Sequence, residues 1–297
     1  MNYLLFCEAF CNAIEIVETT NIPNIKSKKK KLIDSFCNTV KKADCYNQEF
    51  HSICHELEVF NYLSKINYNP IPSDDSKPGA DFNADIGFIE CISATMGDEK
   101  TKQELINKRK DYDKFAVHHV SQSWPAIIES RFTSVIKDKK DKFSDYIKAN
   151  VIDKKSPCII CVSSTAFIWN THSEDFEIMF KKILYGIDYL QTMVFSTKNS
   201  SKPEYIETIN AFNDICKKGD VVRFQTGYFN LKEYKNISAV ILVNRPIAEQ
   251  IDKEKFIFYL NYNANNKIDV VKLNDVIYFS FDGIINNKRQ FSYKNRK

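Results

Sequence analysis

The stretch Gly79-Ala80-Asp81-Phe82, followed by a short turn and then by Phe88-Ile89-Glu90-Cys91-Ile92, decides the fold of this chain. Side chains alternate along a strand, so Glu90 shares one face with the apolar residues two positions before and after it, whereas Cys91 points to the opposite face. Apolar residues on both faces indicate a strand buried in the centre of a sheet. A hairpin between the two segments then brings Asp81 close to Glu90.

A carboxylate in such a strand needs a compensating partner. An ionised Glu90 without one costs several kcal/mol, and the usual remedies are a cation, a metal ion or a raised pKa. Asp81 supplies a second carboxylate, and two carboxylates together favour a hard divalent cation with oxygen ligands. The structural alternative is that Asp81 begins a turn and Glu90 forms a salt bridge.

The composition is that of a globular protein. The chain has 297 residues, 43% hydrophobic and 27% charged, which is enough for one large domain or two ordinary ones. The net charge of +4 is modest, so binding to a polyanion has to come from local basic clusters. Such clusters lie at residues 26–31, 108–110, 137–142 and 288–297. For the first and the last we favour a solvated face or a frayed end.

Cysteine usage and the N-terminal sequence point to a reducing compartment. The nine cysteines lack the even spacing of a disulfide framework, and residues 1–8 lack the basic start of a secretory leader. A cytoplasmic location is therefore predicted, although export without a classical leader is also compatible with the sequence. No apolar run approaches the roughly 20 residues that span a bilayer, so no membrane partner is expected.

Two local patterns have the spacing of zinc ligands but favour a structural role. Cys158 and Cys161 have CxxC spacing, yet they lie in an apolar strand-like run, where side chains three positions apart point to opposite faces. His51 and His55 are one helical turn apart, but no Glu lies between them, as it does in helical zinc motifs of this spacing. We expect neither pair to form a zinc site.

Periodicity and breakers along the chain predict an α/β fold. Helices are expected as two segments within residues 1–45, and over 49–65, 99–117, 125–150 and 174–190. Strands are expected over residues 157–165, 221–228, 237–244, 255–262 and 276–281. Alternating helices and buried strands indicate a mixed central sheet flanked by helices, with an N-terminal helical layer and a β-rich C-terminal part.

The helix predicted over residues 125–150 carries a lysine in an unexpected place. Its apolar stripe consists of Phe132, Val135, Ile136, Phe143 and Tyr146. Lys139 falls at the centre of this stripe, whereas Lys137 and Lys140 fall on the opposite side, where we expect solvent. Lys139 either extends along the stripe to the rim or reaches the metal site or its reacting phosphate. Arg131 and Lys142 flank the stripe, where they could contact a phosphate backbone.

Several motifs, taken in order, resemble a known superfamily. They are His55-Glu56-Leu57, Gly79-Ala80-Asp81-Phe82, Ile89-Glu90-Cys91-Ile92 and the basic helix 131–142. Together they resemble an uncharacterised bacterial branch of the PD-(D/E)XK, or restriction-endonuclease-like, superfamily, which shows WEL, GPDF and WIEA at these places. Later landmarks of the branch are similar to residues 158–162, 183–186, 237–240 and 261–264.

The resemblance implies a division of the chain into segments. It also shows that this chain departs from the superfamily pattern at the position of the strand lysine. It covers residues 46–275, which implies a restriction-endonuclease-like core with a β-rich extension, preceded by a helical accessory segment at 1–45 and followed by a strand and basic tail at 276–297. The superfamily has a lysine two residues after the strand glutamate, and here that position is Ile92. Lys139 is the candidate to supply the missing ammonium group.

The resemblance implies metal-dependent hydrolysis of phosphodiester bonds; a DNA endonuclease is favoured, and RNA is the alternative substrate. Asp81, Glu90 and the Cys91 carbonyl would hold Mg²⁺ or Mn²⁺, and Glu56 would complete the shell directly or through water. Lys139 would offset charge in the transition state, while basic residues of the same helix, Arg131 and Lys142, position the nucleic acid. The alternative is a catalytically degenerate module that binds nucleic acid or a protein partner.

Overall fold

The computed structural model describes residues 3–42, 47–74, 76–95, 123–164, 173–191, 205–209, 212–217, 220–245, 249–285 and 288–295. The helix expected over residues 99–117 and the basic cluster at 108–110 lie outside these ranges. All structural statements below concern the described residues.

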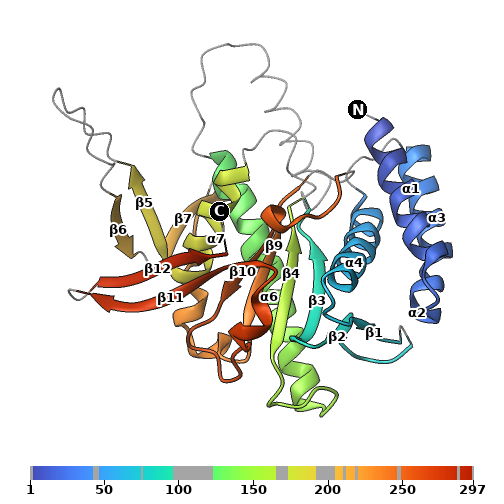
Figure 1. Cartoon of the computed structure of the whole chain (residues 1–297). Helices are drawn as coiled ribbons and strands as arrows, with labels where there is room; N and C mark the ends of the chain where they lie inside the picture. Colours follow the sequence, from blue (N-terminus) through green and yellow to red (C-terminus); the bar gives the residue numbers. More distant parts are fainter. Residues whose placement is uncertain are drawn as a thin grey trace.

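A mixed eight-stranded sheet forms the centre of the molecule, with strand order β1-β2-β3-β4-β9-β10-β11-β12 (Figure 1). Its strands are β1 (Ile71–Pro72), β2 (Phe82–Ala84), β3 (Gly87–Ser93), β4 (Cys158–Ser163), β9 (Ala239–Val243), β10 (Phe256–Leu260), β11 (Ile277–Ile285) and β12 (Lys288–Lys294). β3, β4 and β9 are parallel neighbours, and β10 is parallel to β11, while the other neighbouring strands are antiparallel. This arrangement confirms the expected α/β class with a mixed central sheet.

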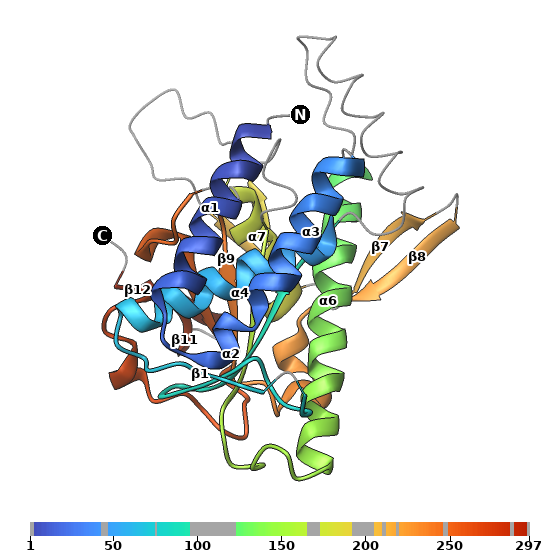
Figure 2. The same ribbon diagram turned by 90° about the vertical axis from the view of Figure 1, so that its right-hand side faces the viewer.

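Helices cover both faces of the sheet. α1 (Tyr3–Thr19), α2 (Pro23–Lys26), α3 (Lys28–Lys42) and α4 (Gln48–Lys65) lie on one face, and α6 (Ser123–Lys148) and α7 (Ser173–Tyr185) contribute to the core on the other. Figure 2 looks onto α1 and α3, with α4 between them and the sheet. The first core cluster therefore joins α1–α4 to the sheet, and the second joins α6 and α7 to its opposite face.

Shorter elements complete the chain. Separate two-stranded ribbons are formed by β5 (Ile187–Gln191) with β6 (Tyr205–Ile209) and by β7 (Phe212–Lys217) with β8 (Asp220–Gln225). The 3-10 turns are η2 (Tyr228–Asn230), η3 (Lys232–Tyr234), η4 (Lys253–Lys255) and η5 (Val270–Leu273).

α4 is positioned by a capped start and buried almost all round. The Asn47 side chain accepts hydrogen bonds from the backbone N–H groups of Glu49 and Phe50, which satisfies donors that the first helical turn leaves free. Because the helix lies between the sheet and the α1–α3 layer, its buried residues include His51 and His55 as well as the expected apolar stripe. α4 therefore presents polar side chains to the sheet at fixed positions.

The end of α7 differs from the sequence-based expectation. The helix predicted over residues 174–190 stops at Tyr185, and the following residues form β5. Gly186 follows the helix with φ +71°, a left-handed conformation that glycine adopts without steric cost and that commonly ends helices. The apolar residues after Gly186 continued the helical pattern in sequence, but the glycine ends the helix.

Along the described part of the chain, no helix is both long enough and apolar enough to cross a membrane.

Candidate functional site

The β2–β3 hairpin places Asp81 against the strand that carries Glu90. Phe82 in β2 pairs with Ile89 in β3, and Asp81 immediately precedes β2. Its carboxylate accepts a hydrogen bond of 2.7 Å from the backbone N–H of Cys91. The expected hairpin is therefore confirmed, and the backbone of β3 itself fixes the position of Asp81.

Glu90 is fully buried and contacts lysines from α6. Its Oε2 lies 2.5 Å from the Nζ of Lys139 and 3.0 Å from the Nζ of Lys142. Its Oε1 is buried and has no hydrogen-bond partner among the residues that the structure describes. One oxygen of the carboxylate is thus compensated by two ammonium groups, while the other retains unused capacity to bind a cation.

Asp81 lies in a negative electrostatic environment. Burial, followed by the charges of Glu56 and Glu90, raises the pKa of the Asp81 carboxyl from 3.8 to about 7, against the opposing effects of Lys139 and of the Cys91 N–H group. The ionised form of Asp81 is therefore disfavoured unless further positive charge is present. A bound divalent cation is one source of that charge.

Glu56 joins the site from α4 and is paired with a lysine of the N-terminal layer. The Nζ of Lys28, in the first turn of α3, lies 2.8 Å from Glu56 Oε1, and both side chains are largely buried. Sequence reasoning missed Lys28, because it belongs to the basic run for which we favoured a solvated face. The sequence did carry one signal for the burial of Lys28: this residue lies four positions before Leu32, which is buried on the same face of α3.

The lysines of α6 are arranged differently from the helical-wheel expectation. Lys140, expected to face solvent, is buried; it forms an ion pair with Asp141, and its Nζ lies 5.5 Å from the ring centre of Tyr234. The expectation failed because η3, far along the sequence, covers that side of α6. Lys139 is 14% exposed and Lys142 is 44% exposed, so the site opens to solvent at Lys142.

Arg131 and Ile92 lie on α6 and β3, the elements that also carry Lys139 and Glu90. Arg131 begins the same side of α6 about two turns before Lys139, and its Nε is buried with no hydrogen-bond partner within the described ranges. Ile92 packs against the α6–α7 side of the core, on the face of β3 that also carries Glu90. The position two residues after the strand glutamate is therefore apolar, and α6 supplies the ammonium groups.

A second group of reactive side chains lies on the opposite face of β3 and β4. A ring nitrogen of His55 and the sulfurs of Cys91 and Cys161 all lie within 4.8 Å of one another, and the three residues are buried; we call this group the thiol cluster. Cys158, by contrast, packs on the α6–α7 side of the sheet. The predicted opposite orientation of Cys158 and Cys161 is therefore confirmed.

The thiol cluster is linked by polar contacts. His55 Nε2 lies 3.3 Å from the Cys161 carbonyl oxygen. Burial has the largest effect on the Cys161 thiol and raises its pKa, but hydrogen bonds with Cys91 and His55 outweigh it and lower the pKa to about 6. Burial raises the pKa of Cys91 well above its usual value. Sequence reasoning missed the cluster because its members are brought together by strand register and by the docking of α4.

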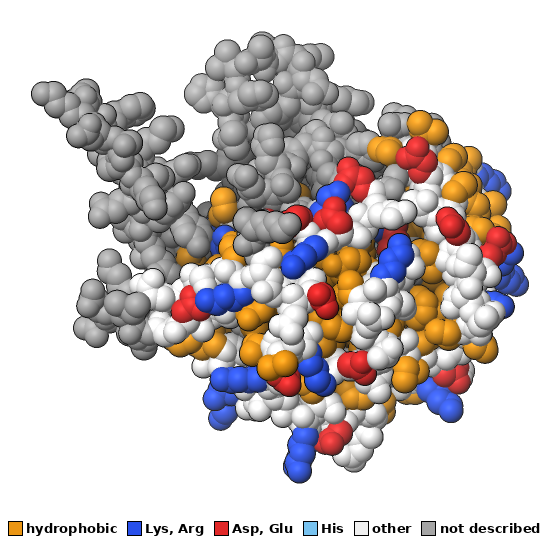
Figure 3. Space-filling model, viewed as in Figure 1, with side chains coloured by type: hydrophobic (Ala, Val, Ile, Leu, Met, Phe, Trp, Pro, Cys, Tyr) orange, Lys and Arg blue, Asp and Glu red, His pale blue; other side chains and the backbone are white. Residues whose placement is uncertain are grey.

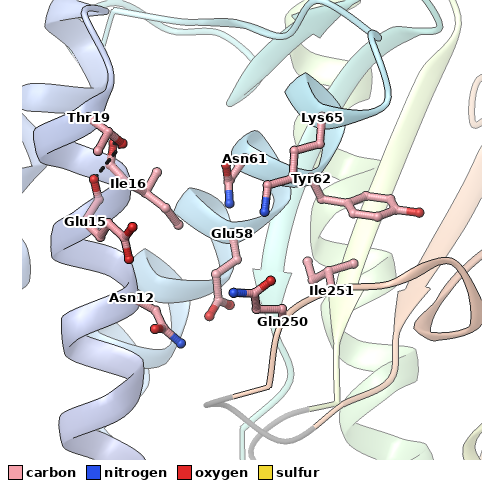
Figure 4. A pocket seen from close by; sticks show the side chains of 10 residues that line it. All are labelled: Asn12, Glu15, Ile16, Thr19, Glu58, Asn61, Tyr62, Lys65, Gln250 and Ile251. Atoms are coloured by element: carbon pink, nitrogen blue, oxygen red, sulfur yellow. Dashed lines mark hydrogen bonds between the residues drawn. The ribbon is translucent and has the colours of Figure 1, made fainter.

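A surface pocket lies apart from these residues. It is lined by Asn12, Glu15, Ile16, Thr19, Glu58, Asn61, Tyr62, Lys65, Gln250 and Ile251 (Figure 4). α1 and α4 form its walls, and none of the carboxylates or lysines described above lines it. Glu58 forms an ion pair with the buried Arg245. This ion pair links α4 to the segment that directly follows β9.

Charge on the visible surface is mixed. In the view of Figure 3, Lys and Arg side chains are interspersed with Asp and Glu side chains over the described part of that face. Surface charge on this face therefore does not outline a path for a polyanion.

The comparisons with known proteins add no relative from which a function could be transferred: no family model, no curated protein and no solved structure matches this chain.

Proposed function

We propose that this protein is a nuclease with a restriction-endonuclease-like core that hydrolyses phosphodiester bonds of DNA with Mg²⁺ or Mn²⁺. The observation that carries the proposal is the fully buried Glu90, contacted by Lys139 and Lys142 and neighboured by Asp81. A purely structural strand rarely buries a carboxylate of this kind, because its desolvation costs several kcal/mol. A carboxyl group with a strongly raised pKa, such as that of Asp81, among other charged side chains is typical of functional sites.

The order of the elements supports the proposed core. Glu56 lies on α4, Asp81 at the start of the β2–β3 hairpin, Glu90 on β3 and the lysines on α6, followed by β4 parallel to β3. This is the order in which the superfamily-like motifs occur in the sequence. Segments that are far apart in the chain thus contribute to a single site.

The residues present fit a divalent metal ion. Glu90 Oε1 is buried without a hydrogen-bond partner among the described residues, and the pKa of Asp81 is raised by neighbouring negative charge. Asp81, Glu90 and the Cys91 carbonyl would hold the ion, with Glu56 as a further ligand, and such oxygen ligands are the ones that Mg²⁺ prefers. A bound Mg²⁺ polarises a phosphate and makes an attacking water more acidic.

Lys139 and Lys142 would have different roles in the reaction because they differ in exposure to solvent. Lys139 is the more buried and is fixed on Glu90, where its ammonium group can offset negative charge that develops on the phosphate. Lys142 is nearly half exposed and can exchange Glu90 for a phosphate oxygen of the substrate. Arg131, about two turns away on the same helix, extends the basic side of α6 and would position the nucleic acid backbone.

A second candidate function has one observation in its favour. Lys139 and Lys142 both contact the same oxygen of Glu90, and such an arrangement also serves a site that has lost catalysis and keeps the ion cluster for stability. In that case the chain is a binding module for nucleic acid or a protein partner. Metal dependence separates the two functions.

The test is a cleavage assay on linear and supercoiled DNA, with RNA in parallel, comparing wild type with Glu90→Gln. The proposed nuclease cuts DNA with Mg²⁺ or Mn²⁺, stops when EDTA is added, and loses activity in the variant. A binding module shifts DNA in a gel equally well with EDTA present and cuts under neither condition. Cleavage of RNA alone would move the proposal to a ribonuclease.

A further inference from the structure

We propose that the thiol cluster, His55, Cys91 and Cys161, is a binding site for a thiophilic d¹⁰ metal ion, Zn²⁺ or Cu⁺. The cluster lies behind the carboxylate site, on the face of β3 and β4 that packs against α4. The carboxylate site offers oxygen ligands, which suit Mg²⁺, whereas thiolates and imidazole select softer ions. The proposal is therefore a second metal site of different chemistry.

The backbone places the ligands close to the arrangement that such an ion requires. Cys91 and Cys161 are direct partners in the parallel β3–β4 pairing, so strand register holds the two sulfurs side by side. All ligand atoms lie within 4.8 Å of one another. Around a zinc ion with Zn–S distances of about 2.3 Å and Zn–N distances of about 2.0 Å, tetrahedral ligands lie roughly 3.5–3.8 Å apart. Metal binding would draw the ligand atoms from separations of up to 4.8 Å into this range by rotation of the three side chains.

His55 has the hydrogen-bonding pattern of a metal ligand. A ligating histidine usually donates its second ring N–H to a carboxylate or a backbone carbonyl. His55 Nε2 lies 3.3 Å from the Cys161 carbonyl oxygen, and its Nδ1 is buried with no hydrogen-bond partner in the described part of the chain. One ring nitrogen of His55 lies within 4.8 Å of both sulfurs, so the imidazole can bind a metal ion together with them.

Charge balance favours Zn²⁺ over Cu⁺ in this dry environment. When Zn²⁺ binds, the Cys91 and Cys161 thiols each lose a proton to solvent and each sulfur donates an electron pair to the metal. Two thiolates and one Zn²⁺ carry no net charge, which suits a buried position. The described residues supply three ligands, so Zn²⁺ would take a small further ligand in its fourth position, whereas Cu⁺ needs none.

The site would fix the elements that carry the carboxylates. His55 directly precedes Glu56 on α4, and Cys91 directly follows Glu90 on β3. A metal ion between them would hold α4, β3 and β4 together from the side opposite the ion pairs. This role does not depend on nuclease activity, and its test measures bound metal.

The experiment uses the full chain, purified under reducing conditions and stripped with a chelator. Wild type is titrated with Co²⁺, a spectroscopic substitute for Zn²⁺, and in parallel with Zn²⁺ and with Cu⁺. For Co²⁺ we expect a thiolate-to-cobalt charge-transfer band whose intensity corresponds to about one ion per chain, because the oxygen ligands of the carboxylate site do not produce this band. Zn²⁺ should abolish this band and raise the melting temperature. Binding of Cu⁺ alone would identify Cu⁺ as the ion.

Two cysteines of the same strand provide matched variants. Cys161→Ala should weaken binding by more than about 100-fold, beyond the effect of losing an outer-shell partner, whereas Cys158→Ala removes an equally buried thiol on the other face and should bind like wild type. Glu90→Gln should also keep the charge-transfer band, which separates this site from the proposed nuclease site.

Three results would overturn the proposal. The first is a wild-type protein that shows no charge-transfer band with Co²⁺ and binds no Cu⁺, and this result does not depend on any variant folding. The second is equal binding by Cys161→Ala and Cys158→Ala. The third is a Cys91–Cys161 disulfide in the purified protein that reducing agent does not convert into a metal-binding form.

Discussion

The charges of Glu90 and Glu56 both act on Asp81, but these two negative charges are balanced in different ways. Glu90 is fully buried on the central strand and contacts two lysines of α6, Lys139 and Lys142. Glu56, on α4, is partly exposed and pairs with Lys28 from the N-terminal layer. The deeper carboxylate thus receives more positive charge, as expected from the cost of desolvating it. The comparison predicts that changes at Glu90 have larger effects than changes at Glu56.

The largest effect is expected for Glu90→Gln. The amide keeps the shape of the side chain but cannot hold a divalent cation as a carboxylate does, so DNA cleavage should fall by at least two to three orders of magnitude, roughly the loss when one preorganised electrostatic group is removed. Single-turnover cleavage rates at saturating Mg²⁺ measure this loss. Glu56→Gln should reduce the rate less, and Glu254→Gln, on the exposed η4 turn, should not change it.

A greater loss for Glu56→Gln than for Glu90→Gln would reverse the comparison, because it would make the α4 carboxylate the principal ligand. Circular dichroism and melting temperatures of each variant establish that the lost rate reflects the site and not unfolding.

The next effect concerns the neighbouring lysines of α6. Lys139→Met keeps a long apolar side chain but removes the ammonium group from Glu90, and cleavage should fall by about two orders of magnitude. The free energy of unfolding should also fall, because the buried carboxylate loses one of its two ammonium partners. The expected loss is only about 1–3 kcal/mol, since Lys142 still contacts the carboxylate. The stability loss follows from the contact of Lys139 with the fully buried Glu90.

Lys140→Met is the matched control for this prediction. Lys140 is also buried but contacts Asp141 and the ring of Tyr234, so its loss should cost about 1 kcal/mol of stability and leave the cleavage rate unchanged. Equal rates for the two variants would show that Lys139 is not catalytic. Adding Ile92→Lys to Lys139→Met tests whether both positions serve the same phosphate, because partial recovery of the rate requires it.

The pH dependence of stability probes Asp81, whose pKa is raised by burial and by the charges of both glutamates. Its pKa is raised from 3.8 to about 7 in the folded protein, so the stabilisation of the protonated form is complete below about pH 4 and is lost as the pH rises through 7. In EDTA, the stability of wild type relative to Asp81→Asn should therefore fall by up to about 1.4 kcal/mol per pH unit over this range. Urea unfolding at several pH values measures it.

Mg²⁺ should flatten this dependence, because a bound cation stabilises the ionised carboxylate. A difference between wild type and Asp81→Asn that is independent of pH in EDTA would mean that Asp81 is ionised throughout, and that the lysines already balance all the acidic groups.

Local periodicity predicted the parts of this fold that depend on neighbouring residues. The β2–β3 hairpin, the alternation around Glu90, the helix α4 and the apolar stripe of α6 all follow from spacings within one segment. Lys139 was identified because it interrupts such a stripe. A residue that breaks a local pattern is visible in the sequence even when its partner is not.

Tertiary packing determined the features that were not predicted from the sequence. Lys140 is buried because η3 covers it, and Lys28 is buried because α3 docks beside α4. The thiol cluster depends on the register that pairs Cys91 with Cys161, strands separated by a long stretch of chain. Gly186 carried a usable signal, since a glycine after an apolar run commonly ends a helix, and the helix prediction extended past it.

The smallest effect is expected at the ion pair between the N-terminal layer and the site. In a double-mutant cycle with Lys28→Met and Glu56→Gln, the coupling free energy should be about 1 kcal/mol, within the range for contacting charged residues. Lys28→Met alone should also lower the Mg²⁺ concentration that gives half-maximal stabilisation, because Glu56 then becomes freer to bind the ion. Lys29→Met, whose lysine pairs with the exposed Glu18, is the surface control and should change stability by less than about 0.5 kcal/mol. A coupling energy near zero would mean that Lys28 closes the α3–α4 interface without affecting the site, and the accessory layer would then be separable from the function of the core.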